Sequence, residues 1–497
     1  MFTPFAQSSR LIGAFRKDLI EKKRDSWYII KTFGLPAERK RARRTLPSGR
    51  KGKNVRIFKN CRITSFQVIA LGFFGLILFG TLLLMLPFSS RQPGGAAAAD
   101  CLFTATSAVC VTGLAVQDTA TFWSPFGQAV ILLLIQVGGM GVVTAAVSLA
   151  FISGRKIGLM QRSVMQESIS APQVGGIVRL TRFIILAAFG IELAGALLLL
   201  PAFIPEFGWG KGAWYALFHS VSAFCNAGFD LMGVRGAFSS MTGFSGSVLV
   251  NAVLILLITV GGIGFLVWND VVQHGIHWKQ YRLQSKIVLT TSLVLVLLPF
   301  LWFFLLEMRE TPAGERVLPA LFQSVTLRTA GFNTVDLNQM SGGGKTLMIL
   351  WMLIGGSPGS TAGGMKTTTV AVLLLTAWSV FRRKEDPACF GRRIGGDAVR
   401  NAAAILMMYF LLFFVSGLVI SRLENLPLLT CLFETASGLG TVGLTLGITG
   451  SLGPVSRGIL MVLMFFGRVG GLTLIYAAQN VRTSPHSTLP VEKITVG

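Results

Sequence analysis

Charged residues are scarce in this chain of 497 residues, because only 13% are Asp, Glu, Lys or Arg. A typical soluble domain carries about 25% charged residues, so the composition excludes an ordinary soluble protein. Acidic residues are the scarcest, with 21 Asp and Glu against 45 Lys and Arg, and the formal net charge is +24. In a soluble protein such an excess would suggest a nucleic-acid partner.

Cysteine and histidine are also few. The six cysteines show no paired or metal-ligand spacing, and small size is a sufficient reason for Cys110 and Cys225. The four histidines form no cluster either. We therefore expect no Cys/His metal site, no catalytic nucleophile and no enzyme activity. The cysteines are Cys61, Cys101, Cys110, Cys225, Cys389 and Cys431.

Signals for secretion and for nucleotide binding are absent from the sequence. Residues 1–65 lack the pattern of a signal peptide, and we expect a cytoplasmic extension with one interfacial helix at 27–33. SGGGKT at 341–346 resembles a phosphate-binding loop, but Gln339 stands where its first glycine is required. GSTAGGMK at 359–366 has Met365 in place of the lysine. No organic cofactor is expected in this chain.

The sequence is rich in long apolar runs, and its mean hydropathy is +0.64. Eight runs of roughly 20 residues have the length that spans a bilayer. They predict an integral membrane protein with eight helical spans. The runs cover residues 66–88, 126–152, 183–204, 248–268, 287–306, 347–380, 402–420 and 459–478.

A short stretch of nearly the same sequence follows each odd-numbered run. It opens with Leu-Phe, continues through small and hydroxyl residues, and ends on a glycine followed by Leu or Phe. Four such stretches at nearly even intervals predict one ancestral unit copied four times. The stretches are LFTATSAVCVTGL (102–114), LFHSVSAFCNAGF (217–229), LFQSVTLRTAGF (321–332) and LFETASGLGTVGL (432–444).

The predicted fold class follows from these two patterns. It is an all-α integral membrane protein with four tandem outer helix–pore helix–inner helix repeats around a central, pseudo-fourfold pore. The repeats are placed at 66–152, 178–270, 285–380 and 399–480. A basic cytoplasmic extension at 1–65 precedes them, and a cytoplasmic tail at 481–497 follows them.

The position of the basic residues predicts the orientation. They are dense before residue 66 and recur after even-numbered runs, as in Arg155-Lys156 and Arg382-Arg383-Lys384, while loops after odd-numbered runs carry few. By the positive-inside rule both termini are cytoplasmic, and the four stretches enter the membrane from outside. The basic extension is then explained by topology and attraction to anionic lipid; nucleic-acid binding is the alternative.

The four glycines suit a cation path. A cation that crosses a membrane exchanges its water shell for protein oxygens, and an extended, curved backbone can supply carbonyl oxygens if one residue adopts φ above zero. Short inward helices also direct their partial negative C-termini toward the centre. The alternative is that the four residues are only packing glycines in re-entrant loops. They are Gly113, Gly228, Gly331 and Gly443.

The third inner run is interrupted by GGSPGSTAGGMKTTT at 355–369. Each glycine costs a helix about 1 kcal/mol and proline about 3 kcal/mol, so a loop should interrupt this helix inside the membrane. The other inner runs contain QVGGMG (136–141), TVGGIG (259–264) and RVGGLT (468–473). Those glycine pairs indicate either close helix packing or a hinge beside a narrow path. Only the third inner helix is predicted to be broken.

These motifs resemble those of the TrkH/KtrB superfamily of potassium transporters over about residues 64–480. The resemblance rests on CVTGL, CNAGF, RTAGFNT and GTVGLT at the four glycines and on GGSPGSTAGG in the third inner helix. With eight spans and no additional helix pair in front, the chain is more similar to KtrB than to TrkH. The resemblance implies potassium as the substrate, with sodium as a second candidate ion, in a bacterial plasma membrane.

The resemblance also implies site residues and partners. It implies a potassium filter of carbonyls, a gate, a homodimer, and a cytoplasmic ring of nucleotide-binding regulatory subunits similar to KtrA or TrkA. The filter residues are Val111, Thr112, Gly113, Asn226, Ala227, Gly228, Thr329, Ala330, Gly331, Thr441, Val442 and Gly443. The gate residues are Gly355, Gly356, Ser357, Pro358, Gly359, Ser360, Thr361, Ala362, Gly363, Gly364, Lys366 and Arg468.

Four charged residues lie within or beside the predicted spans. Arg468 falls inside the last inner helix, where an arginine costs from about 3 to over 10 kcal/mol unless it faces a cavity or a partner. The resemblance implies that it limits ion flux, and pairing with loop carbonyls is the structural alternative. Lys366 either takes part in gating or extends to the membrane interface. Glu434 and Arg328 can pair and brace the filter.

Two mechanisms remain open from the sequence. The first is a gated pore for potassium uptake, and the second is an alternating-access symporter that couples potassium to sodium or protons. Symporters of that kind show inverted repeats with broken helices in corresponding halves. Four repeats of one orientation with a single broken helix favour the pore.

Overall fold

A computed structural model describes residues 64–152, 157–171, 173 and 175–478 of the chain. Several predicted features lie outside these residues. They are the extension before residue 64 with its interfacial helix at 27–33, the basic pair at 155–156, and the tail at 481–497. The described part is mostly helical, with one hairpin of two-residue strands, β1 (Ala388–Cys389) and β2 (Arg392–Arg393).

Four long helices expose many apolar side chains. These outer helices are α2 (Ser65–Leu84), the first part of α7 (Ile177–Phe224), α10 (Leu283–Trp302) with the π-helical turn η4 (Phe303–Glu307), and α14 (Gly396–Glu424). On α14, for example, Met407 and Phe410 are 61% and 54% exposed. A continuous exposed apolar surface of this kind is expected where a helix contacts lipid.

Short helices lead from the outer helices toward the four glycines, and their side chains are largely buried. They are α3 (Ala98–Cys110), the last part of α7, α11 (Ala313–Thr326) and α15 (Leu428–Gly440). The outer and short helices of the second unit are joined within α7, where Gly208 (φ 78°, ψ 168°) forms a kink between them. Helices α3, α11 and α15 have 13, 14 and 13 residues, and the part of α7 after Gly208 ends at Phe224, so all four are too short to cross a bilayer.

The inner helices begin with clear sequence signals. Ser124, Ser247 and Ser341 each cap the first turn through a side-chain oxygen, and Pro125 and Pro454 occupy first helical positions, where proline is favoured. The inner helices are α4 (Pro125–Met140) with α5 (Val142–Ile152), α8 (Val248–Ile263) with α9 (Phe265–His274), α12 (Gly342–Met352) with α13 (Thr367–Phe381), and α16 (Pro454–Val469) with α17 (Gly471–Ala478).

All four inner helices are broken, so the prediction of a single broken helix is wrong. The first, second and fourth bend by 102°, 98° and 93°. Each bend is made by one glycine, Gly141, Gly264 or Gly470, with φ between 87° and 104° and ψ between 132° and 140°. This backbone conformation is open to glycine and strained for other residues. In the third unit the interruption is longer, because α12 ends at Met352 and α13 begins at Thr367.

The span count depends on these breaks. Among the described residues, four helices are long and apolar enough to cross a membrane, and the three bent pairs raise the number to seven. The remaining predicted span, 347–380, is divided between α12 and α13. The connecting segments add α6 (Leu159–Ile169) and the single turns η1 (Met232–Val234), η2 (Thr242–Phe244), η3 (Trp278–Gln280) and η5 (Leu337–Gln339).

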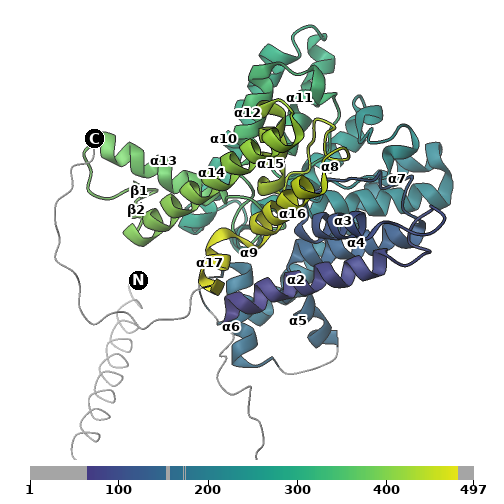
Figure 1. Cartoon of the computed structure of the whole chain (residues 1–497). Helices are drawn as coiled ribbons and strands as arrows, with labels where there is room; N and C mark the ends of the chain where they lie inside the picture. The colour runs from purple at the N-terminus through teal and green to yellow at the C-terminus, as the bar shows by residue number, and fades with distance from the viewer. Residues whose placement is uncertain (1–63, 153–156, 172, 174, 479–497) are drawn as a thin grey trace, which may run out of the picture. The chain divides into compact units, whose positions relative to one another are not determined.

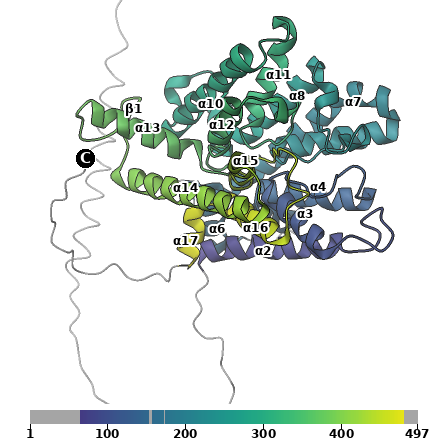
Figure 2. The ribbon, with the colours of Figure 1, turned by 45° about the horizontal axis from the view of Figure 1, so that its top comes forward.

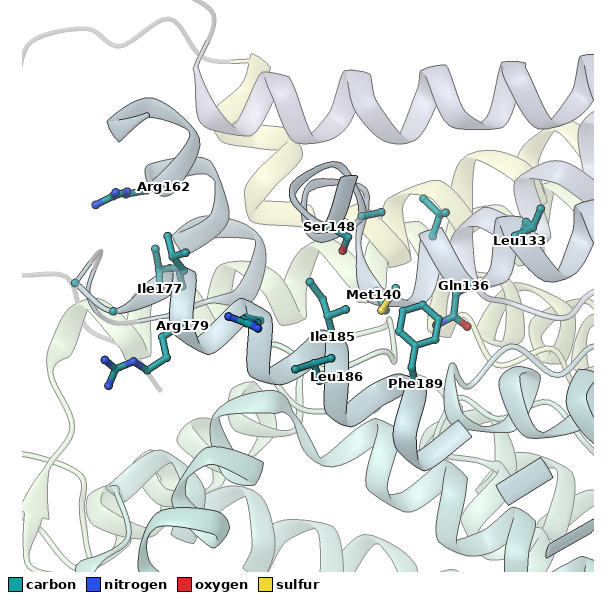
Figure 3. A pocket seen from close by; sticks show the side chains of 16 residues that line it. Leu133, Gln136, Met140, Ser148, Arg162, Ile177, Arg179, Ile185, Leu186 and Phe189 are labelled. Carbon is teal, nitrogen blue, oxygen red and sulfur yellow. The ribbon is translucent and has the colours of Figure 1, made fainter. Parts of the chain in front are cut away.

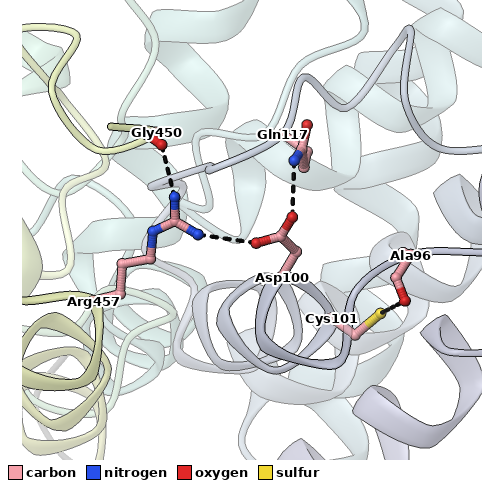
Figure 4. A network of polar contacts seen from close by, with 6 residues as sticks. All are labelled: Ala96, Asp100, Cys101, Gln117, Gly450 and Arg457. Atoms are coloured by element: carbon pink, nitrogen blue, oxygen red, sulfur yellow. Dashed lines mark hydrogen bonds and ion pairs between the residues drawn. The ribbon is translucent and has the colours of Figure 1, made fainter. Parts of the chain in front are cut away.

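The first and last units meet, so the four units close into a ring. Helices α2 and α17 lie side by side (Figures 1 and 2), and the side-chain amide of Gln67 donates to the Ala477 carbonyl at 2.9 Å. An ion pair reinforces this closure (Figure 4): Arg457 of α16 donates to Asp100 of α3 at 3.0 Å and to the Gly450 carbonyl at 2.7 Å. The side chain of Gln117 donates to the second Asp100 oxygen at 2.8 Å.

Candidate functional site

The four repeat glycines lie together where the four short helices end. A β-carbon added to Gly113 would lie 2.5 Å from the Ala227 carbonyl oxygen, and one added to Gly228 would lie 2.8 Å from that of Ala330. A β-carbon on Gly331 would lie 2.5 Å from the Val442 oxygen, and one on Gly443 would be closer still to that of Thr112. Each glycine thus contacts the residue before the next one, in a closed cycle that leaves no room for a side chain. We call this group the glycine ring.

The backbone around the ring repeats the same unusual conformation four times. Each glycine has φ above zero, from 68° to 94°, and so does the residue two positions earlier. Those earlier residues are Val111, Asn226, Thr329 and Thr441, with φ from 52° to 63°. A β-branched residue at positive φ is a genuine outlier, and such strain is concentrated at functional sites. The resemblance had named these four residues as filter positions, but no sequence pattern predicted their positive φ.

A hydroxyl residue in each short helix anchors the strained backbone. The amide of the residue before each glycine donates to the carbonyl of that hydroxyl residue, at 2.8 to 3.0 Å. The hydroxyls of Ser107 and Ser437 also accept from the Gly113 and Gly443 amides, at 3.1 and 3.0 Å. Those of Ser222 and Thr326 donate instead to carbonyls just after the ring. The amide before each ring glycine is therefore paired with the short helix of its own unit.

The carbonyl oxygens of the same residues are left without partners. None of the twelve predicted filter residues has a carbonyl that accepts a hydrogen bond from the part of the chain that the structure describes. Buried backbone carbonyls are normally paired, since an unpaired one costs free energy. Twelve unpaired carbonyls around one ring are suited to replacing the water shell of a cation.

A small cavity of about 60 Å³ lies against one side of the ring, and all four glycines line it. Asp118 and Asp230 also line it, and no sequence motif had indicated either residue. Asp118 accepts from the amides of Ala120 and Thr121 at 3.0 and 2.9 Å. Burial raises the pKa of the Asp230 carboxyl to about 7. The cavity therefore places two acidic side chains in front of the ring.

The breaks in the inner helices lie on the other side of the ring, and they free carbonyl groups at helix ends. The 355–366 segment uses these groups: the Ser357 and Thr361 amides donate to Gly262 and Gly261 at 3.0 and 3.3 Å, and the Gly364 amide donates to Gly467 at 3.1 Å. We call the 355–366 segment, together with Arg468 and the carbonyls that both contact, the broken-helix layer.

Arg468 ties three units together in this layer. Its guanidinium donates to the Thr361 carbonyl of the segment and to the carbonyls of Gly138 and Gly139 at the end of α4, the last at 2.7 Å. Thr361 in turn donates from its hydroxyl to the Phe224 carbonyl at 3.0 Å, just before the ring. The pairing with loop carbonyls, the structural alternative for Arg468, is thus present in the structure.

The other three charged residues, Lys366, Glu434 and Arg328, differ in their hydrogen-bond partners. Lys366 donates to the Ala362 and Gly363 carbonyls at 2.9 and 3.4 Å, so it closes the segment on itself and does not extend to the interface. The predicted pair of Glu434 and Arg328 is wrong for the described residues. Glu434 accepts instead from Thr449 at 3.0 Å, from Thr445 and from the Leu446 amide. The Arg328 Nε and Nη2 atoms have no partner among the described residues.

One glycine in each of three inner helices packs against a short helix. A β-carbon on Gly138, Gly261 or Gly467 would collide with the carbonyl of Val109, Phe224 or Leu439, each four residues before a ring glycine of its own unit. Close packing therefore explains the predicted pairs that begin at Gly138 and Gly261, and the bend lies three residues later in those two helices. In the fourth inner helix the predicted pair at 470–471 contains the bend itself, at Gly470. A cavity of about 280 Å³ beyond the broken-helix layer is lined by Lys366, Arg468 and part of α6.

Comparisons with known proteins show what the chain as a whole is similar to. The family profile described as "TrkH: Cation transport protein" matches residues 63–488. The chain is 39% identical to the "Potassium/sodium uptake protein NtpJ" of Enterococcus hirae over 447 residues, 88% of this chain and 98% of the relative. It is also 39% identical to the "Ktr system potassium uptake protein B" of Bacillus subtilis over 435 residues, 86% and 96% of the two chains.

A solved structure has the same fold. The crystal structure of the potassium transporter TrkH from Vibrio parahaemolyticus is similar with a TM-score of 0.67 and 22% identity. The likeness covers 86% of this chain and 87% of that one.

Proposed function

From the premise that the chain belongs to the TrkH family of cation transport proteins, we propose that it is the ion-translocating membrane subunit of a potassium uptake system. The curated relatives at 39% identity are named for potassium uptake. The observation that carries the proposal is the set of twelve unpaired carbonyls at the glycine ring. In this proposal they bind potassium, with sodium as a second candidate ion.

A pore is favoured over an alternating-access symporter. All four inner helices are broken, so the number of broken helices does not by itself favour a pore. The four breaks instead follow the same fourfold order as the ring, whereas alternating-access transporters place broken helices in corresponding halves of two repeats. A ring that contacts itself in one closed cycle supports a single central path for the ion.

The broken-helix layer is proposed as the gate. It lies across the path on the side of the ring opposite the acidic cavity, and hydrogen bonds from three units hold it there. Small residues let the 355–366 segment change shape at little steric cost. The gate residues are Gly355, Gly356, Ser357, Pro358, Gly359, Ser360, Thr361, Ala362, Gly363, Gly364, Lys366 and Arg468.

Orientation and partners complete the proposal. Both termini are cytoplasmic in a bacterial plasma membrane, so the acidic cavity faces outside and the broken-helix layer faces the cytoplasm. The name "Ktr system" of one relative supports a system with more than one component. We assign to it a homodimer of this chain on a cytoplasmic ring of nucleotide-binding regulatory subunits, with anionic lipid around the basic extension and no nucleic acid.

Electrical recording from the purified chain in a planar bilayer tests the function. Unitary current steps that reverse near the potassium equilibrium potential are expected for the pore. A fixed coupling ratio between potassium and a second ion, without unitary steps, would establish the symporter instead. Absence of any potassium flux, with the protein folded in the bilayer, would contradict both.

Deletion of residues 357–362 tests the gate in the same assay. Maximal flux should rise several-fold while the potassium affinity remains nearly unchanged, because the obstruction is removed and the ring is not. A deletion that alters affinity at constant flux would place the segment in support of the ring.

A further inference from the structure

A lateral pocket of about 1240 Å³ lies between α4, α5, α6 and α7, and none of the four ring glycines lines it. It exceeds the roughly 300–1,000 Å³ of typical small-molecule sites. Leu133, Leu186 and Phe189 line it and are 65%, 64% and 51% exposed. Exposed apolar side chains of a membrane-spanning helix face lipid tails, so the pocket opens sideways toward the hydrocarbon of the bilayer.

The pocket has a strongly basic end. Arg162 of α6 and Arg179 and Arg182 of α7 line it, and none of the three forms an ion pair within the described part of the chain. Figure 3 shows Arg162 and Arg179 at one end and Leu133 and Phe189 toward the other. Among the residues that line the pocket there is no aspartate or glutamate. The pocket is thus divided into a cationic and an apolar part.

The start of α7 adds to the positive potential at this end. Helix α7 begins at Ile177 after Gly176, and no side chain caps its first turn. Gly175, Gly176 and Ile177 themselves line the pocket. The uncapped amides of a helix N-terminus attract phosphate, and here they lie beside three arginines.

We infer that this pocket binds one anionic phospholipid. Its phosphate contacts Arg162, Arg179, Arg182 and the start of α7, and its acyl chains lie along Leu186 and Phe189. Charge complementarity selects an anionic over a zwitterionic headgroup. In the orientation proposed above, the arginines lie at the cytoplasmic leaflet, where anionic lipids concentrate.

The same lipid has a route to the broken-helix layer. The Ile169 carbonyl at the end of α6 contacts Gly359 of the 355–366 segment, at the position where a β-carbon would collide with it. Glu167 and Ser168 of α6 line the 280 Å³ cavity beyond that layer. Because Arg162 is on the same eleven-residue helix, a phosphate held by Arg162 restrains α6 against the gate. Bound lipid should therefore change the flux and leave the ion preference unaltered.

Binding is tested on the purified full chain in detergent by titration with phosphatidylglycerol or phosphatidylcholine, read out by native mass spectrometry. The test variant is Arg179→Gln with Arg182→Gln. The control is Arg383→Gln with Arg392→Gln, two exposed arginines that do not line the pocket. Phosphatidylglycerol affinity should fall about fivefold for each pocket arginine removed, and the control should match the wild type.

Four results would overturn the lipid site, and the last of them concerns inorganic phosphate. The first is equal affinity for the two lipids, and the second is an unchanged phosphatidylglycerol affinity in the test variant. The third is a loss of dimers in the test variant without any change in lipid binding, which would mean that a second copy of this chain covers the pocket. Inorganic phosphate at millimolar concentration should not displace the lipid; if it does, the site binds a free anion instead.

The route through α6 has a separate test. Unlike the binding test, it rests on the proposed function, because it measures potassium flux. Potassium flux into liposomes with and without phosphatidylglycerol should differ several-fold for the wild type and the control variant, and not for the test variant. The ratio of potassium to sodium flux should remain constant throughout. If lipid binds as described but flux does not respond, the coupling is wrong, whereas absence of any flux contradicts the proposed function and leaves the binding result intact.

Discussion

Two layers of the molecule use backbone carbonyls in opposite ways. At the glycine ring, the filter carbonyls accept no hydrogen bond from described residues, although the amide before each ring glycine is anchored to a short helix. In the broken-helix layer, the carbonyls freed by Gly141, Gly264 and Gly470 accept bonds from Arg468 and from the 355–366 segment. The first layer repeats one geometry four times, whereas in the second the third unit departs from the other three.

The difference separates two properties of transport. An unpaired carbonyl oxygen held at fixed geometry can coordinate a cation, so the ring should decide which ion passes. A paired carbonyl is satisfied, and its hydrogen bond must break before the segment moves, so the broken-helix layer should decide how many ions pass. Ion preference and maximal rate should therefore respond to different substitutions.

The largest expected effect comes from Gly443→Ser in the ring. A serine at φ 94° is strained by about 1–2 kcal/mol, and its β-carbon would displace the Thr112 carbonyl. Potassium-over-sodium preference should fall about tenfold or more at unchanged protein level, as measured by competitive uptake. The control is Gly447→Ser, where φ is also positive, at 91°, and nothing lies within 4 Å of the added carbon. Equal preference in both variants would remove the filter assignment.

Arg468→Ala should have the next largest effect, on rate and not on preference. At about 6 Å in an effective dielectric of 20, a unit charge repels a cation by nearly 3 kcal/mol, and the carbonyl bonds of Arg468 offset part of this. Maximal flux should rise about tenfold. Arg468→Lys keeps the charge and loses the planar fork, so it separates repulsion from bonding. Equal or lower turnover of the alanine variant at equal expression would leave only a structural role.

Thr361→Val should have a smaller effect on rate. The substitution removes the hydroxyl bond to the Phe224 carbonyl, and such a bond stabilises by about 1 kcal/mol. If the gate is mostly closed in the wild type, the open fraction should rise about fivefold. The flux should rise by the same factor. Thr361→Ser retains the hydroxyl and should behave as the wild type. A change in potassium affinity without a change in flux would assign Thr361 to the ring instead.

The smallest expected effect is a pH dependence on the acidic side of the ring. Since burial raises the pKa of Asp230 from 3.8 to about 7, lowering the external pH from 8 to 6 neutralises it. At about 8 Å in water, one negative charge attracts a potassium ion by about 0.5 kcal/mol. Loss of the Asp230 charge should therefore lower the potassium affinity about twofold. Asp230→Asn should have the low affinity at both pH values; an unchanged pH dependence would assign the titration to another group.

The ring shows what sequence patterns can and cannot predict. The four glycines, the apolar runs and the interruption at 355–366 were all evident from the sequence, because each is a local departure from helical composition. The positive φ at Val111 and Thr441 was not evident, since no local rule places a β-branched residue there. Hydrogen bonds to the short helix and contacts with the neighbouring units together hold this backbone in place.

The charged residues divide in the same way. The burial of Arg468 in the last inner helix was predictable, because an arginine within an apolar run must find a partner. Its partners, the carbonyls of Gly138, Gly139 and Thr361, come from units far away in the sequence. The pairing of Arg328 with Glu434 failed because Thr445 and Thr449 on the following loop already satisfy Glu434.

The sequence alone determined that this is a fourfold membrane protein, with a glycine at each inward stretch and one long interruption. Those features depend on composition and period, which are readable without tertiary structure. The tertiary structure decided that three more inner helices break, each at a single glycine. A single glycine is tolerated within a helix at about 1 kcal/mol, so it bends only where neighbouring units bind the carbonyls that the bend sets free.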